Sequence, residues 1–206
     1  MQRYSLSSAR TLASVGIFAA LTFLATFVIK IPTPTFGYIH IGDCFVLLSG
    51  LLLGPVCGGL AAGIGSALSD LLAGYAVWVP GTFLIKFLTA AVAAKIFVRL
   101  RRISEKKAGK QVPVSGTSSV LSKTAFPFLP SAVCGELVMT AGYFLYNILI
   151  VSFFSSTVSA GLAAAAAVSL AEIPFNLIQG AAGIVLAAVL YPVFVRATAR
   201  SHLRTI

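Results

Sequence analysis

The sequence predicts an all-α integral membrane protein, a compact bundle of six transmembrane helices with both termini in the cytoplasm. Its composition is the first observation: 58% of the 206 residues are hydrophobic and 10% are charged, which is typical of a membrane protein rather than a soluble domain. The second is a series of apolar segments, several of them long enough to cross a bilayer. The third is the position of the basic residues, most of which lie outside these segments.

One transmembrane domain covering residues 1–206 has room for about six spans. Gly54-Pro55 separates the second span from the third, because this dipeptide interrupts a helix. The polar and basic region 99–125 is expected to be a cytoplasmic loop. Region 155–170 is rich in alanine and is either a short helix on the outer surface or an early start of the last span. The spans are expected at about 9–30, 41–55, 57–74, 80–98, 128–153 and 171–195.

The basic residues indicate the orientation. They gather near the N-terminus, in region 99–125 and in the tail, all on one side of a six-span arrangement, and only Lys30 lies at an opposite end. By the positive-inside rule, both termini and the long loop are cytoplasmic. Because topology explains the net charge of +10, no nucleic-acid partner is expected.

Two helices carry polar stripes. Glu172, Asn176, Gln179 and Gly183 recur at i, i+4, i+7 and i+11 of the last span, so they share one helix face. The fifth span repeats the pattern. Polar groups are costly toward lipid, so two facing stripes indicate a ligand cavity; the alternative is that they only join neighbouring helices by hydrogen bonds. The second stripe consists of Glu136, Thr140, Tyr143 and Asn147.

Other polar residues near the outer face are candidates for the same cavity. Tyr38 and His40 either touch a ligand or anchor the chain at the interface. Lys86 lies inside the fourth span, where it either pairs with Asp70 or snorkels to the surface. Asp43 begins the second span and is expected to cap it. The candidate substrate-binding residues are Tyr38, His40, Trp78, Lys86, Glu136, Tyr143, Asn147, Glu172, Asn176 and Gln179.

The sequence argues against an enzyme. It contains no HExxH pattern, and its histidines, His40 and His202, lie near or outside span boundaries. The three cysteines are isolated within apolar segments, which predicts buried side chains rather than a disulfide or a metal site. We expect no catalytic residue, no metal and no cofactor in this chain. A stand-alone proton- or ion-coupled transporter stays an alternative, because the intramembrane acids and Lys86 could carry protons.

Four segments give the chain a family resemblance: GIFAAL, GYIHIGD with LLLGPVCGGLAAGIGSALSDLLAGY, GELVMTAGYFLYN, and IPFNLIQGAAG. Together they resemble the substrate-binding (S) components of energy-coupling factor (ECF) transporters, in the riboflavin-type branch. The resemblance implies a multi-pass protein of the prokaryotic plasma membrane that binds a vitamin near the outer face. It also implies a transmembrane coupling (T) subunit, on which the S component topples, and two ATPase (A) subunits. These partners would use ATP and Mg²⁺, since this chain has no P-loop.

The first span contains two pairs of small residues that would let another helix approach closely. Ordinary packing within the protein is the alternative reading. The resemblance implies that one pair docks on the coupling subunit, and the candidates are Ala9 with Ala13 and Gly16 with Ala20. For the ligand, amide, carboxyl and phenol groups suit a flat uncharged heterocycle. We therefore expect pyridoxine or hydroxymethylpyrimidine first and riboflavin next.

Overall fold

Glycine and proline set several of the helix boundaries in the computed structural model, which describes residues 9–33, 38–107, 117–154 and 158–203. Within these ranges the chain forms six helices and one short antiparallel hairpin, in which Ile31 pairs with Ile39 and Pro32 with Tyr38. The elements are α1 (Ala9–Val28), β1 (Ile31–Pro32), β2 (Tyr38–Ile39), α2 (Asp43–Leu53), α3 (Pro55–Leu72), α4 (Val79–Lys107), α5 (Thr117–Phe154) and α6 (Val158–Leu203).

The predicted break between the second and third spans is confirmed. Gly54 adopts φ 85° and ψ 179°, a left-handed φ that glycine reaches without strain. Pro55 then opens α3, where a missing N–H costs nothing and the fixed φ favours a helix start. The two residues therefore turn the chain sharply between two helices.

Helix α3 packs closely against its neighbours. A Cβ atom added at Gly65 would lie 2.4 Å from the carbonyl oxygen of Ala19 on α1. One added at Gly59 would lie 2.8 Å from the ring of Phe87 on α4. Small residues let the backbones of neighbouring helices approach each other this closely. As a result α3 packs tightly between α1 and α4.

Helices α4, α5 and α6 are longer than expected. The region expected to be a loop, 99–125, is helical up to Lys107 and again from Thr117, so that prediction was wrong in its extent. The chain keeps good helix formers such as Arg, Lys and Glu in 99–107, and helical propensity continues where the membrane ends. Of region 155–170, residues from Val158 onward form the first part of α6; residues 155–157 lie outside the described ranges.

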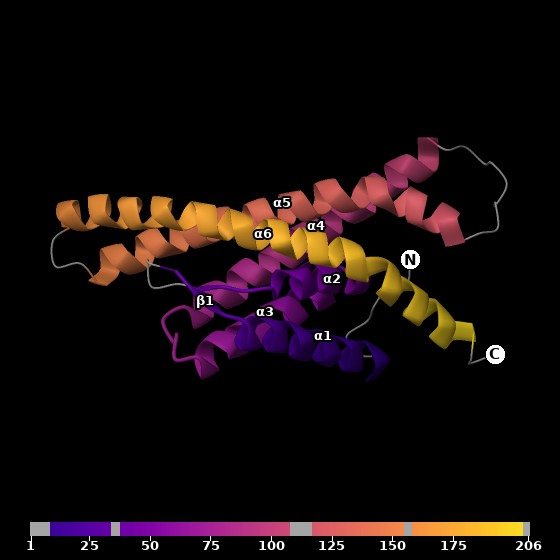
Figure 1. Cartoon of the computed structure of the whole chain (residues 1–206), viewed down its shortest axis with the longest axis horizontal. Helices are drawn as coiled ribbons and strands as arrows, with labels where there is room; N and C mark the ends of the chain where they lie inside the picture. Colours follow the sequence, from indigo (N-terminus) through magenta and orange to yellow (C-terminus); the bar gives the residue numbers. More distant parts are fainter. Residues whose placement is uncertain (1–8, 34–37, 108–116, 155–157, 204–206) are drawn as a thin grey trace.

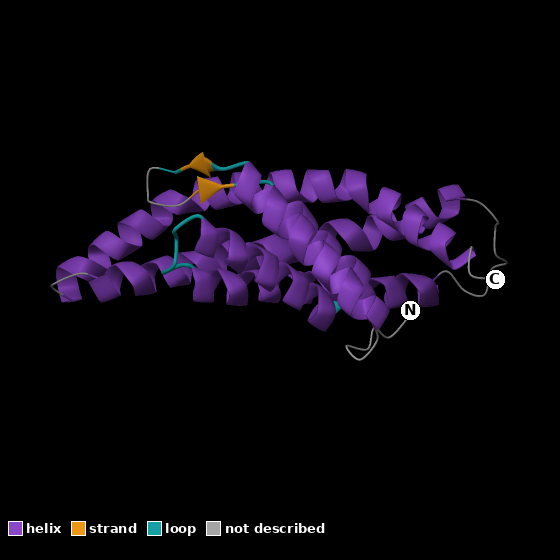
Figure 2. Ribbon diagram, turned by 90° about the horizontal axis from the view of Figure 1, so that it is seen from below, coloured by secondary structure: helices purple, strands orange, loops and turns teal. Residues whose placement is uncertain are grey.

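The helices lie roughly along one long axis, with α5 and α6 side by side and α1 and α3 on the opposite side of the bundle (Figure 1). The start of α1, the end of α6 and the ends of α4 and α5 next to their connection all lie at one end of the molecule (Figure 1). The hairpin lies toward the other end and on the surface of the bundle (Figure 2). The described helix ends nearest to the two termini and to the α4–α5 connection therefore lie together at one end of the bundle.

Four of the helices in the described ranges are long and apolar enough to cross a membrane: α1, α3, and most of α5 and α6. The helix α2 is apolar but has 11 residues, and α4 combines apolar turns with a basic end. Length and composition therefore support a multi-pass membrane protein.

Candidate functional site

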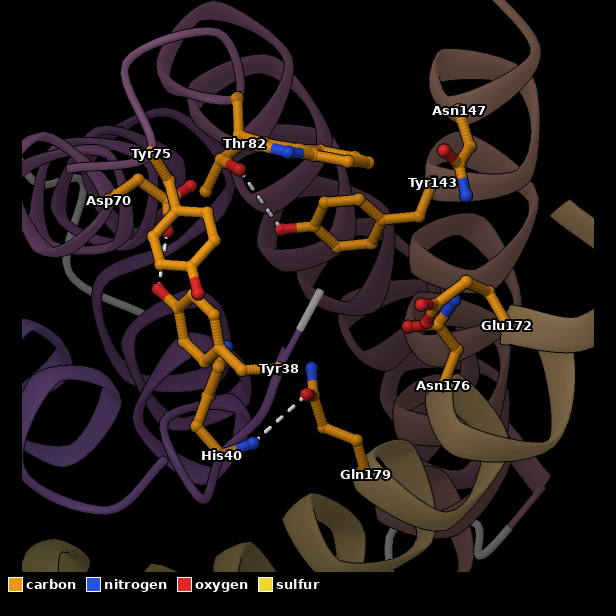
Figure 3. Close-up of a pocket in the computed structure, with 11 residues that line it drawn as sticks. Tyr38, His40, Asp70, Tyr75, Thr82, Tyr143, Asn147, Glu172, Asn176 and Gln179 are labelled. Carbon is orange, nitrogen blue, oxygen red and sulfur yellow. Dashed lines mark hydrogen bonds between the residues drawn. The ribbon is translucent and has the colours of Figure 1, made fainter. Parts of the chain in front are cut away.

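A cavity of about 530 Å³, including the space at its open mouth, lies among the hairpin, the ends of α3 and α4, and helices α5 and α6. Side chains from these elements converge on it (Figure 3). Within the described part of the chain, no lysine or arginine is among the lining residues, which are Tyr38, His40, Asp70, Tyr75, Trp78, Thr82, Tyr143, Asn147, Glu172, Asn176 and Gln179.

The hairpin is held beside this cavity by two contacts, one from Tyr38 of β2 and one from Thr33, the residue after β1. On one side the Tyr38 hydroxyl donates to Asp70 Oδ1 of α3 (Figure 3). On the other, the Thr33 hydroxyl donates to Glu172 Oε1 of α6 at 2.8 Å. Because Tyr38 and Glu172 also line the cavity, the contacts that fix the hairpin are themselves part of the cavity wall.

A buried polar chain lies beneath the cavity. Lys86 Nζ is 2.5 Å from Asp43 Oδ1, and both side chains are fully buried. Gln179 Nε2 donates to Asp43 Oδ2 at 2.6 Å, and Gln179 Oε1 accepts from the His40 backbone N–H at 3.1 Å. Two expectations are thereby corrected. Lys86 pairs with Asp43 rather than Asp70, and the Asp43 carboxylate bonds to these side chains instead of capping α2, whose start shows no side-chain cap.

His40 is a neutral hydrogen-bonding group. Its Nδ1 accepts from the Gly42 backbone N–H at 3.0 Å, so the proton is on Nε2. Burial, followed by the charge of nearby Lys86, lowers the pKa of His40 to about 3. The imidazole therefore contributes a donor to the cavity wall and no positive charge at neutral pH.

Aromatic rings make up another part of the wall. Trp78 lies 6.3 Å from Tyr143 and 5.7 Å from Tyr146 between ring centroids, and Tyr38 lies 5.1 Å from Tyr75. The Tyr143 hydroxyl donates to Thr82 Oγ1 at 3.3 Å (Figure 3). Rings with polar tips can stack on a flat ligand while their hydroxyl groups orient it.

The structure brings together eight of the ten predicted site residues: Tyr38, His40, Trp78, Tyr143, Asn147, Glu172, Asn176 and Gln179. Lys86 lies behind the wall, bonded to Asp43, and Glu136 lines a different cavity. Sequence reasoning left three lining residues out of the site, namely Asp70, Tyr75 and Thr82. Thr82 precedes Lys86 by four residues and so shares its helix face, and this spacing was the signal that could have found it.

Glu136 lines a second cavity, away from most of the other predicted site residues. It lies between α5 and α6, and Glu136, Thr140 and Asn176 are its polar lining residues. Both Glu136 carboxyl oxygens are buried with no hydrogen-bond partner among the described residues. The side chain passes close to Gly180, where an added Cβ atom would lie 3.1 Å from Glu136 Oε2. The fifth-span stripe is therefore divided, with Tyr143 and Asn147 at the main cavity and Glu136 and Thr140 at the second one.

The small residues of α1 face outward. All four candidates for docking are exposed, and a Cβ atom added at Gly16 would have no neighbour within 4 Å. They therefore form one open strip on α1, made of Ala9, Ala13, Gly16 and Ala20. For metals, no group of three or more histidine, cysteine, aspartate or glutamate side chains gathers within the described ranges.

Comparison with known proteins places the chain in context. A family model described as "ECF-type riboflavin transporter, S component" matches residues 6–196. A solved structure described as "Structure and mechanism of the S component of a bacterial ECF transporter" shares the fold with a TM-score of 0.56 at 20% identity, over 92% of this chain and 97% of that one. An uncharacterised protein of Pyrococcus woesei is 42% identical over 64 residues, which are 31% of this chain and 43% of the relative.

Proposed function

Because the chain belongs to the family of S components of ECF-type riboflavin transporters, we propose that it captures a small heterocyclic vitamin, or a vitamin precursor, in the cavity beside the hairpin. A member of this family is a substrate-binding transporter subunit and not an enzyme. The observation that carries the proposal is the convergence of the two polar stripes on one cavity: Tyr143 and Asn147 of α5 line it together with Glu172, Asn176 and Gln179 of α6 (Figure 3).

The lining supports a flat, uncharged ring with hydroxyl or amino substituents. Asn147 and Asn176 offer both donors and acceptors, Glu172 offers an acceptor, and the rings of Trp78 and Tyr143 offer stacking surfaces. A phosphorylated ligand would require a cationic partner, which the lining lacks. Pyridoxine or hydroxymethylpyrimidine is therefore our first candidate. Riboflavin is the second, and the description of the matching family favours it.

Each predicted site residue then has a proposed role. The eight predicted residues that line the main cavity contact the substrate. Lys86 acts through Asp43 and Gln179, which hold the backbone of His40 in place. Glu136 adjoins the substrate site through Asn176, which lines both cavities.

We further propose that this cavity opens to the outside, with both termini and the α4–α5 connection in the cytoplasm of a prokaryotic cell. The basic residues favour this orientation. The bound vitamin is delivered when the chain topples on a T subunit, driven by two A subunits that use ATP and Mg²⁺. The exposed strip of α1 suits such docking, since small side chains permit close approach of a partner helix.

Mass spectrometry of small molecules released from the detergent-purified protein tests the substrate. A B6 vitamer, hydroxymethylpyrimidine or flavin in stoichiometric amount is the expected result. If nothing is released, titration of purified protein with pyridoxine, hydroxymethylpyrimidine and riboflavin follows, and failure to bind any of them contradicts the proposal.

Transport in vesicles then separates this function from that of an ion-coupled carrier. Vesicles with this chain alone are expected to bind the vitamin without concentrating it. Accumulation should require the T and A subunits and ATP. Uptake by the chain alone, driven by an ion gradient, would instead establish the stand-alone transporter.

A further inference from the structure

Four basic side chains form a stripe along the end of α4. Lys95, Arg99, Arg102 and Lys106 recur at i, i+4, i+7 and i+11, so they share one helix face, and all four are exposed. We call these four residues the basic stripe. The positive-inside rule explains basic residues on this side of the membrane, but it does not require that they align on one face.

The same face of α4 carries exposed leucines closer to the start of the helix. Leu84 and Leu88 precede Lys95 by eleven and seven residues, which places them on the face of the basic stripe. They are 56% and 41% exposed, as expected of side chains that contact acyl chains. On this face of α4, exposed leucines near the start are followed, past the buried Ala91, by exposed lysine and arginine.

The stripe reaches from the hydrocarbon core to the lipid headgroups. Helix α4 has 29 residues, a length of about 43 Å, and a bilayer with its headgroups is about 40–45 Å thick. Lys95 and Lys106 lie about 24 Å and 40 Å along the helix from Val79. The stripe therefore begins in the far part of the hydrocarbon core, from which Lys95 can snorkel, and ends among the headgroups.

No acidic residue of the protein neutralises the stripe. The chain contains five acidic residues. Asp43, Asp70, Glu136 and Glu172 belong to the two cavities or to the buried pair. The fifth, Glu105, bonds to Arg101 at 2.9 Å and not to a residue of the stripe. The positive charge is therefore available to an external anion.

We propose that the basic stripe binds the phosphate headgroups of anionic membrane lipids, and so fixes the depth and tilt of α4. A lipid-facing row of lysine and arginine beside a membrane span attracts anionic headgroups at about 1 kcal/mol per residue, or roughly fivefold in affinity. Neither the lipid site nor its test depends on the vitamin that the main cavity binds.

Native mass spectrometry of the full chain, titrated with phosphatidylglycerol or phosphatidylcholine in detergent, tests the proposal. The wild type is expected to bind phosphatidylglycerol at least about tenfold more tightly than phosphatidylcholine. The variant R99Q/R102Q/K106Q should lose affinity for phosphatidylglycerol on the order of a hundredfold. The control R10Q/R196Q removes two exposed charges outside the stripe and should lose less than fivefold.

The proposal would be overturned if the wild type showed no preference for the anionic lipid, or if the two variants lost the same affinity for it. It would also be overturned if the stripe variant no longer assembled with the T and A subunits in lipid-free detergent. That last result would assign the stripe to a protein partner. Thermal unfolding in detergent, measured on the same samples, should be unchanged in both variants, which verifies that they are folded.

Discussion

Lys86 Nζ lies 2.5 Å from Asp43 Oδ1, with both side chains fully buried, and this contact joins α4 to α2 beneath the cavity. The second carboxylate oxygen of Asp43 accepts from Gln179 of α6. One carboxylate thus joins three helices. The His40 backbone N–H donates to the side-chain oxygen of the same Gln179.

Replacing Lys86 by Met should destabilise the protein by about 3–5 kcal/mol, because it leaves the Asp43 charge buried and uncompensated. The double variant Asp43→Asn/Lys86→Met removes both charges and should recover much of that loss. Thermal unfolding in detergent measures both effects. An unchanged melting temperature in Lys86→Met would show that the pair contributes nothing to stability.

Asn176→Ala should weaken vitamin binding by about tenfold, since it removes a hydrogen-bonding amide from the cavity wall. Glu172→Gln should also weaken it, because it removes a charged acceptor. Isothermal titration with the vitamin identified from the purified protein gives the affinities. Ile178→Ala, on a 59% exposed side chain of the same helix, is the matched control and should bind normally. Either site variant with wild-type affinity would remove that residue from the site.

Ala20→Trp should abolish ATP-dependent uptake while leaving vitamin binding intact, since a large side chain blocks close approach of a helix to the exposed strip of α1. Val28→Trp, at a 70% exposed position on the same helix, controls for the presence of an exposed tryptophan. Uptake in vesicles and binding in detergent are measured side by side. Loss of affinity in Ala20→Trp would refute the separation of docking from binding.

His40 should make stability depend on pH. Burial lowers its pKa from 6.5 to about 3, so between these values the unfolded chain binds a proton that the folded protein excludes. The resulting stability is fully present above about pH 6.5 and is lost as the pH falls toward 3, by up to a few kcal/mol. His40→Asn keeps an acceptor for the Gly42 N–H. Melting temperatures from pH 7.5 to 4.5 should fall more steeply for the wild type, and parallel curves would contradict this origin.

Particular residues show how far the sequence could predict the site. The stripe of the last span was readable because helical spacing alone places Glu172, Asn176 and Gln179 on one face, and all three line the cavity. The same reasoning grouped Glu136 with Tyr143, yet the two line different cavities. Helical spacing gives the face of a residue but not its height relative to neighbouring helices. For the same reason Lys86 could not be assigned to Asp43 rather than Asp70.

The sequence by itself determined the membrane class, the helix break at Gly54-Pro55 and the polar faces of α5 and α6, because these follow from apolar length, local backbone preferences and helical periodicity. The tertiary structure alone decided which acid neutralises Lys86, that Tyr75 and Thr82 join the cavity, and that Asp70 and Glu172 hold the hairpin. These contacts join residues up to 139 positions apart. Their partners are chosen by the packing of whole helices, which no local pattern records.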